Sequence, residues 1–136
     1  MVTVYDVTPN KLVAKVAEKL KGMDIPQPSY IGTVKSGAHA ERMPQQKDFW
    51  YIRLASLLRN AYVHGNVGVG KLRTHYGGKK VRGVKPERKV RAGGSIIRKG
   101  MQALEKAGLM TKKKKGRELS AAGKKLLDAS AKEAAS

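Results

Sequence analysis

The chain has 136 residues, a net charge of +19 and a mean hydropathy of −0.47, and it contains no cysteine. This length is typical of one domain, and 40% apolar residues are enough for a modest core. The lack of cysteine excludes disulfides and thiolate metal sites, and no apolar run approaches the roughly 18 residues of a membrane span. We therefore expect a single domain over residues 1–136, located in the cytoplasm, with no membrane partner.

Positive charge is concentrated in one stretch of the chain. Seventeen of the 29 basic residues lie between Lys71 and Arg117, where Glu87 and Glu105 are the only acidic residues, so this stretch supplies +15 of the net charge. A block of this kind is typical of proteins that bind a phosphate backbone. An anionic membrane surface is the weaker alternative, because it is usually met by a basic amphipathic helix with large apolar anchors.

Two helices are predicted in the first half of the chain. Thr8 and Pro9 form a helix start, and Gly22 a stop, around an apolar stripe of helical spacing. Residues 24–44 contain several prolines and glycines, so we expect an irregular strap around the core, with a short β-like run at 31–35. Asp48 caps a second helix that ends near Gly65.

This second helix is apolar almost all round. At 100° per residue only Arg53, Ser56, Asn60 and His64 form a narrow polar stripe, which predicts a helix in the centre of a bundle. Arg59 falls outside that stripe. Its guanidinium must find an anion or carbonyl groups, or extend to solvent.

The second half alternates short helices and turns. We expect a short helix between Gly65 and Gly78, then a basic loop at 79–94 that is flexible without RNA, because its seven basic residues have few apolar anchors. An amphipathic helix capped by Ser95 follows, and a hairpin spans 109–120 with a lysine tip at 112–115. A last helix begins at Ser120, and its end at 130–136 is expected to fray.

The order of these elements is that of a winged helix. The fold class expected is mainly α: a winged-helix-like bundle around a central helix, with a small β-hairpin as the wing. The helix after Ser95 is the third helix of the winged-helix order. It presents Arg98, Lys99, Gln102 and Lys106, with the hairpin tip beside it. In the run 71–95, the glycines, the arginines and the pair His75 and Tyr76 are suited to phosphate contact and base stacking.

Catalytic and metal sites are not indicated. His39, His64 and His75 fit no compact metal motif, the acidic residues do not pair at catalytic spacing, and the glycines form no phosphate-cradle signature. We expect no cofactor, no metal and no enzyme activity. A free winged-helix DNA-binding regulator is the main alternative to an RNA-binding protein, and an enzyme acting on RNA is a third.

Five ordered blocks of sequence resemble a known family. They are PSYIGTVKSG (28–37), DFWYIRLASLLR (48–59), GVGKLRTHYGG (68–78), GSIIRKGMQALEKAGLM (94–110) and GRELSAAGKKLLD (116–128). In this order they resemble the ribosomal protein family nineteen-e of the small subunit, shared by archaea and eukaryotes. The chain differs from the family pattern in having Tyr30 in place of Trp and four lysines at the hairpin tip.

The resemblance implies a structural protein bound to small-subunit rRNA in the head, with neighbouring ribosomal proteins as further partners and a role in pre-rRNA maturation and subunit assembly. The free protein is expected to be a monomer. Arg53 and Arg59 match the family's aromatic-R-x5-R helix, and Arg98 and Lys99 match its basic pair. With the charged positions identified above, the candidate RNA-binding residues are Arg53, Arg59, Lys71, Arg73, Lys79, Lys80, Arg82, Arg88, Arg91, Arg98, Lys99, Gln102, Lys113 and Lys114.

Overall fold

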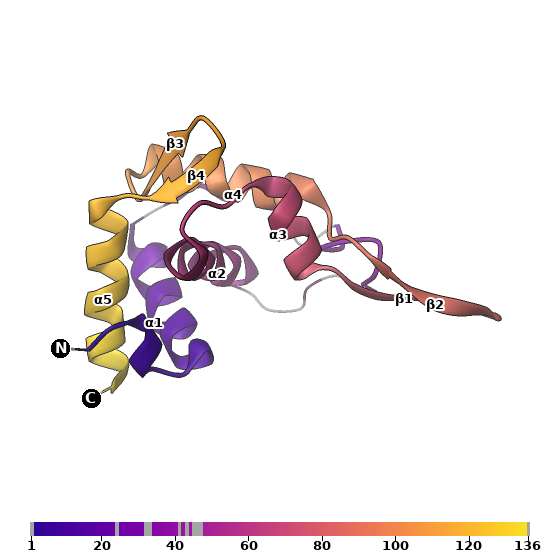
Figure 1. The fold of residues 1–136 in the computed structure, drawn as a ribbon, viewed down its shortest axis with the longest axis horizontal. Helices are drawn as coiled ribbons and strands as arrows, with labels where there is room; N and C mark the ends of the chain where they lie inside the picture. Colours follow the sequence, from indigo (N-terminus) through magenta and orange to yellow (C-terminus); the bar gives the residue numbers. More distant parts are fainter. Residues whose placement is uncertain are drawn as a thin grey trace.

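The computed structural model describes residues 2–23, 25–31, 34–40, 42, 44 and 48–135. This part of the chain is mainly helical, with two small antiparallel hairpins (Figure 1). The helices are α1 (Pro9–Gly22), α2 (Phe49–His64), α3 (Val69–Tyr76), α4 (Gly94–Lys106) and α5 (Ala121–Ala135), preceded by a 3-10 turn at Val4–Asp6. The strands are β1 (Gly78–Arg82), β2 (Lys85–Val90), β3 (Met110–Lys113) and β4 (Gly116–Leu119).

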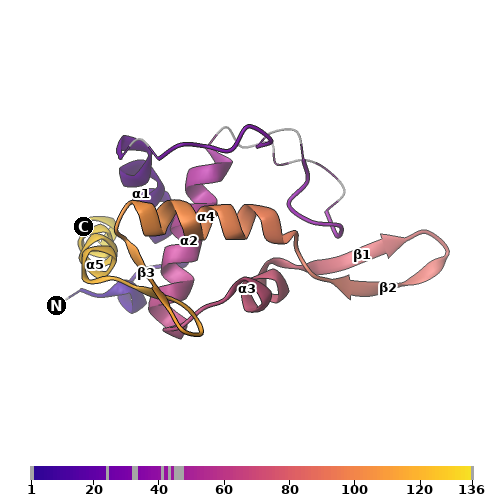
Figure 2. The same ribbon diagram turned by 90° about the horizontal axis from the view of Figure 1, so that it is seen from above.

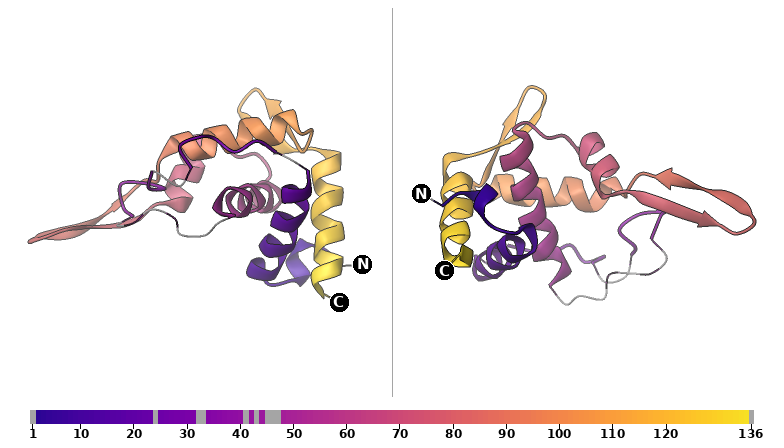
Figure 3. Two further views of the ribbon diagram at one scale, coloured as in Figure 1. Left: turned by 180° about the vertical axis from the view of Figure 1, so that it is seen from behind. Right: turned by 60° about the horizontal axis from the view of Figure 1, so that its bottom comes forward.

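Helix α2 lies in the centre, as its sequence predicts. Leu54, Leu57 and Leu58 have no exposed surface, and Trp50 is 1% exposed. Helix α1 packs on α2, and α5 lies beside α1 at the far side of the molecule (Figure 3). Burial on several sides explains why this helix lacks the broad polar face of a surface helix.

Helix α4 crosses over α2 (Figure 2). Gly100 is buried at this crossing, where an added Cβ would lie 2.8 Å from Leu57 Cδ1 and 3.1 Å from Leu54 Cδ2. The absence of a side chain at Gly100 therefore allows the two helices to approach closely.

The winged-helix order is confirmed. Between α2 and α3, Val67 pairs with Arg117 of β4: the Val67 amide donates to the Arg117 carbonyl at 2.9 Å and the reverse bond is 2.8 Å. This bridge adds a third strand position to the β3–β4 wing. The sequence α2, bridge, α3, α4, β3, β4 is the element order of a winged helix.

The prediction of a loop at 79–94 is wrong, because most of this segment forms a hairpin. Strands β1 and β2 pair Gly78 with Val90, Lys79 with Lys89 and Lys80 with Arg88, and the turn includes Gly83 at φ +71°. The hairpin, which we call the basic arm (78–90), projects away from the helices (Figures 1 and 2). Both its faces are solvated, so its strands lack the apolar alternation by which strands are detected. Whether the arm is mobile in the free protein stays a prediction.

The helix ends also differ in detail from the predictions. Thr8 and Asp48 occupy the predicted N-cap positions, but neither side chain makes a capping hydrogen bond, and α4 begins at Gly94 rather than after Ser95. Ser120 caps the N-terminus of α5, since its Oγ accepts a hydrogen bond from the Gly123 amide at 3.2 Å. Helix α5 extends to Ala135, with Ser130 and Ala131 buried, and fraying of its end stays a prediction.

The strap is described in part. No described residue of the predicted β-like run 31–35 is in a strand, and residues 32 and 33 lie outside the described residues. The strap runs along α4 (Figure 2), where the Tyr30 hydroxyl lies 3.0 Å from Ser95 Oγ. At Ser36 the strap reaches the base of the arm, where the Gly93 amide donates to the Ser36 carbonyl at 2.9 Å.

Candidate nucleic-acid interface

Two basic hairpins stand at opposite ends of α4. The basic arm leaves the N-terminal end of the helix, and the β3–β4 wing lies at its C-terminal end (Figure 1). Arg98 and Lys99 on α4 are exposed, as are Lys113 and Lys114 at the wing tip, whereas Gln102 is half-buried. Helix α4 and the two hairpins therefore carry exposed positive charge from one end of the helix to the other.

The register of the arm places like charges opposite each other. Lys79 pairs with Lys89 and Lys80 with Arg88, so each face of the arm carries a basic cross-strand pair. Like charges directly opposite in an antiparallel pair are destabilising. Arg82 is half-buried and uses its Nε–H on the Pro86 carbonyl at 2.9 Å. The arm is thus a narrow positive projection whose own repulsion a polyanion would relieve.

The base of the arm is held by two of the candidate arginines. Arg73 Nε donates to the Ala92 carbonyl at 2.8 Å, and Arg91 Nη2 donates to the Gly70 carbonyl at 3.0 Å. Both guanidinium groups therefore connect α3 to the segment after β2. Lys71, on the same helix, is exposed. Arg73 and Arg91 therefore stabilise the base of the arm, a role that could not be predicted from residue type and charge.

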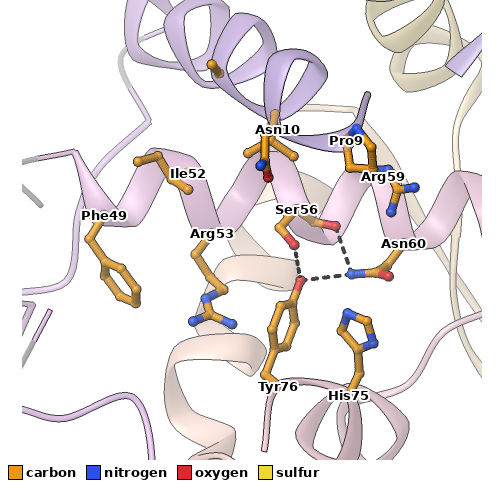
Figure 4. A pocket seen from close by; sticks show the side chains of 12 residues that line it. Pro9, Asn10, Phe49, Ile52, Arg53, Ser56, Arg59, Asn60, His75 and Tyr76 are labelled. Atoms are coloured by element: carbon orange, nitrogen blue, oxygen red, sulfur yellow. Dashed lines mark hydrogen bonds between the residues drawn. The ribbon is translucent and has the colours of Figure 1, made fainter. Parts of the chain in front are cut away.

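Arg53 lies between two aromatic rings. Its guanidinium carbon is 4.0 Å from the centre of the Tyr76 ring and 5.3 Å from that of Phe49 (Figure 4). Burial lowers the pKa of Arg53 below its ordinary value, and the neighbouring Tyr76 opposes this effect. An arginine keeps its proton in proteins, so the site holds a permanent, partly desolvated positive charge.

Tyr76 joins the polar stripe of α2 to α3. Its hydroxyl lies 2.6 Å from Ser56 Oγ and accepts from Asn60 Nδ2 at 2.9 Å (Figure 4). The edge of the His75 ring also meets it, with centroids 4.9 Å apart. Tyr76, which is expected from the sequence to stack on a base, therefore stacks on Arg53 inside the protein. The narrow stripe on an otherwise apolar helix was the signal for this network, but the sequence did not identify the partner.

Arg59 stands apart from the other basic residues. Its Nε is buried without a hydrogen-bond partner, and no ion pair joins it to another described residue. Together with Arg53 and His75 it lines a pocket between α1, α2 and α3 (Figure 4). No residue of α4 or of the hairpins lines this pocket, but Arg53 also lines a smaller hollow with Ile96 and Ile97 of α4. The structure therefore places Arg59, and not Arg53, apart from α4.

Other kinds of site are not evident in the part of the chain that the structure describes. There, no three His, Cys, Asp or Glu residues are grouped as a metal site would require. No helix among the described residues has the length and apolar character to cross a membrane.

Fold and surface together define a winged-helix protein with an arm inserted between α3 and α4, and with basic residues along α4 and both hairpins. Residues 3–136 match the family described as "Ribosomal protein S19e". The chain belongs to this family of small-subunit ribosomal proteins, which are structural and not enzymatic.

Relatives from archaea and eukaryotes cover nearly the whole chain, and each is named small ribosomal subunit protein eS19. The protein of Aeropyrum pernix is 42% identical over 98% of this chain and 90% of its own length. That of Haloarcula marismortui is 41% identical over 94% of this chain and 88% of its own length. The fungal protein of Emericella nidulans is 40% identical over 96% of this chain and 90% of its own length. These matches confirm the family that the five sequence blocks indicate.

Proposed function

We propose that this protein binds small-subunit rRNA in the head of the subunit, beside neighbouring ribosomal proteins, and supports pre-rRNA maturation and subunit assembly in the cytoplasm. The observation that carries the proposal is the basic arm. Its cross-strand pairs Lys79–Lys89 and Lys80–Arg88 concentrate repulsive charge on a projection with little buried apolar surface. Such an element gains stability when phosphates lie along it.

The position of the arm favours RNA over DNA. In a DNA-binding winged helix, a short turn precedes the recognition helix, whose N-terminal residues enter the major groove. Here the connection from α3 to α4 carries the arm, which projects from the N-terminal end of α4 (Figure 2). A straight duplex has little room for both the helix and the arm, whereas folded RNA offers irregular surfaces. A DNA-binding regulator is therefore the second candidate.

The register offers a sharp test of the interface. Replacing Lys79 and Lys80 together by Glu places carboxylates opposite Lys89 and Arg88, so the hairpin is kept by attraction while the charge of the arm falls by four. Replacing Lys124 and Lys125 by Glu makes the same change in net charge on exposed positions of α5. These control residues lie outside the proposed surface.

The measurement is a titration of a structured small-subunit rRNA fragment at several salt concentrations. For about six to ten phosphate contacts, affinity is expected to fall roughly 10³- to 10⁵-fold between 50 and 200 mM salt by the relation for B-DNA, and less on RNA. The arm variant should bind more weakly and with a shallower salt slope than the α5 control. Equal affinities for the two variants, or tighter binding to a DNA duplex than to the RNA fragment, would count against the proposal.

The maturation role needs a cellular test. Depletion of the protein is expected to reduce free small subunits and to accumulate unprocessed small-subunit pre-rRNA, both visible by sedimentation and hybridisation. The arm variant should restore the subunits less well than the α5 control variant. Normal subunit levels after depletion would refute this part of the proposal.

A further inference from the structure

The pocket between α1, α2 and α3 is separate from the surface on which the proposed function rests. It has a volume of about 430 Å³, within the range of pockets that hold small organic groups. Val13 and Ala14 of α1 and Phe49 and Ile52 of α2 supply apolar lining. Phe49 and Ile52 lie toward one end of α2 and Arg59 and Asn60 toward the other, with His75 near Asn60 (Figure 4).

The charge of this pocket is entirely positive. The described residues that line it include Arg53, Arg59 and His75 and no Asp or Glu. The pKa of His75 is lowered, first by burial and then by the positive charges of His64, Arg53 and Arg59. These groups repel one another when no anion is present. Arg59, whose Nε is buried without a partner, lacks the carboxylate or carbonyl group that usually accompanies a partly buried guanidinium.

The other polar side chains of the pocket are already hydrogen-bonded, and the guanidinium of Arg53 is held in place by its neighbours. Ser56 and Asn60 are satisfied by Tyr76 and by each other, since Asn60 Nδ2 also donates to the Ser56 carbonyl at 3.0 Å. Arg53 is held between Phe49 and Tyr76. The free donors therefore belong to arginines on a rigid helix, next to an apolar wall. One part of the lining suits an anion and another a flat apolar group.

We propose that this pocket receives one unstacked nucleotide of single-stranded RNA, with the phosphate on Arg59 and His75 and the base against Val13 and Ile52. An acidic peptide would satisfy the arginines but would leave the apolar lining of the pocket uncovered. The pocket lies near the base of the basic arm, because Tyr76 comes two residues before β1 begins at Gly78. An RNA strand bound along the arm therefore comes close to the pocket.

This inference rests on the proposed function and adds a second, structurally distinct contact for RNA. It predicts that the protein distinguishes single-stranded from paired RNA at this site, since a base within a duplex does not enter a pocket without leaving the stack. The surface of α4 and the hairpins has no such requirement.

The test uses the full chain and four probes: a seven-nucleotide adenosine RNA, adenosine monophosphate, inorganic phosphate and a hexaglutamate peptide. Methyl resonances of Val13 and Ile52 and the titration of the His75 ring are followed by NMR. The seven-nucleotide RNA should shift the methyl resonances and raise the pKa of His75, because its phosphate offsets the surrounding positive charge. Inorganic phosphate should raise the pKa of His75 without moving the methyl resonances.

Two variants separate the phosphate from the base. Arg59→Gln should weaken the binding of the seven-nucleotide RNA about ten- to hundredfold, the range for loss of a hydrogen bond to a charged group. Ala14→Phe, at an exposed position of α1, should fill the pocket and weaken the same RNA, whereas Ala129→Phe, at an exposed position of α5, should have no effect. Circular dichroism spectra should show all three variants folded.

Several outcomes would overturn the inference. Methyl resonances that the RNA leaves unshifted, equal RNA affinity of Ala14→Phe and Ala129→Phe, or tighter binding of hexaglutamate than of RNA would each exclude a nucleotide site. Equal affinity for the monophosphate and the seven-nucleotide RNA would make it a site for a free nucleotide. Failure of the proposed function is distinguishable, because it appears as loss of binding to the structured rRNA fragment, which the α4 surface and the arm govern.

Discussion

Replacing Tyr76 by Phe removes one oxygen atom from the contact between α2 and α3. The ring and its stacking on Arg53, 4.0 Å away, are kept. The bonds to Ser56 Oγ at 2.6 Å and from Asn60 Nδ2 at 2.9 Å are lost, and Asn60 is only 3% exposed. Two lost bonds and a buried donor left without its acceptor lower the free energy of unfolding by about 2 kcal/mol.

The loss is measurable by thermal and denaturant unfolding. For a domain of this size, about 2 kcal/mol corresponds to a decrease in Tm of roughly 8 °C. Tyr5→Phe is the matched control, because Tyr5 is 67% exposed and its hydroxyl is not part of the network; its Tm should equal that of the parent. The slope of the denaturant transition should be unchanged in both variants, since neither alters the surface exposed on unfolding.

A double-mutant cycle tests the assignment of the bond itself. Ser56→Ala and Tyr76→Phe remove the two ends of one hydrogen bond, so the double variant should lose less stability than the sum of the single variants, with a coupling of about 0.5–1.5 kcal/mol. Additive effects, or a Tyr76→Phe variant as stable as the Tyr5→Phe control, would refute the network as described. A lower RNA affinity of folded Tyr76→Phe would further show that the network positions the arm.

Three other outcomes are expected. Arg98→Ala should leave the Tm nearly unchanged and weaken RNA binding by about 1–3 kcal/mol, because Arg98 is exposed. Arg53→Ala should lower both the Tm and the RNA affinity, because the stacked guanidinium of Arg53 supports the fold. Paired melting curves and RNA titrations of the two variants test this difference. Gly123→Ala should lower the Tm in spite of its better helix propensity, since the new Cβ would overlap the Leu109 carbonyl oxygen. An unchanged Tm, or a crystal structure of the variant with that carbonyl in its original position, would contradict this expectation. The unfolded chain binds a proton at His75 more readily than the folded protein, so stability should decrease as the pH falls through the ordinary histidine range near 6.5 and below, and His75→Gln should make that pH dependence shallower in denaturant titrations.

The helices were readable from the sequence because their signals are local. Apolar residues at helical spacing and the stop at Gly22 placed α1, and the nearly continuous apolar surface of residues 49–62 predicted a central α2. The wing was likewise predicted from short β-capable arms around a lysine tip. In each case the residues that decide the element lie within a few positions of one another.

The basic arm was missed because its stability does not come from side-chain burial. Val81 and Val84 are 57% and 105% exposed, so the strands have no apolar face, and the ladder of backbone hydrogen bonds is held at its base by Arg73 and Arg91. A composition of glycine and like charges predicts a loop when only local propensity is considered. The anchoring residues lie about 20 positions apart in the chain and become neighbours only in the fold.

The sequence by itself determined where the charge lies, which segments are helical and which family the chain resembles, because composition, periodicity and motif order are properties of the linear chain. Only the tertiary structure decided how that charge is used. It placed Arg59 in a pocket that no residue of α4 lines, used Arg73 and Arg91 as anchors and gave Tyr76 an internal partner. The physical reason is that a side chain's role depends on the groups packed against it, and those groups come from elements whose mutual position the local sequence does not encode.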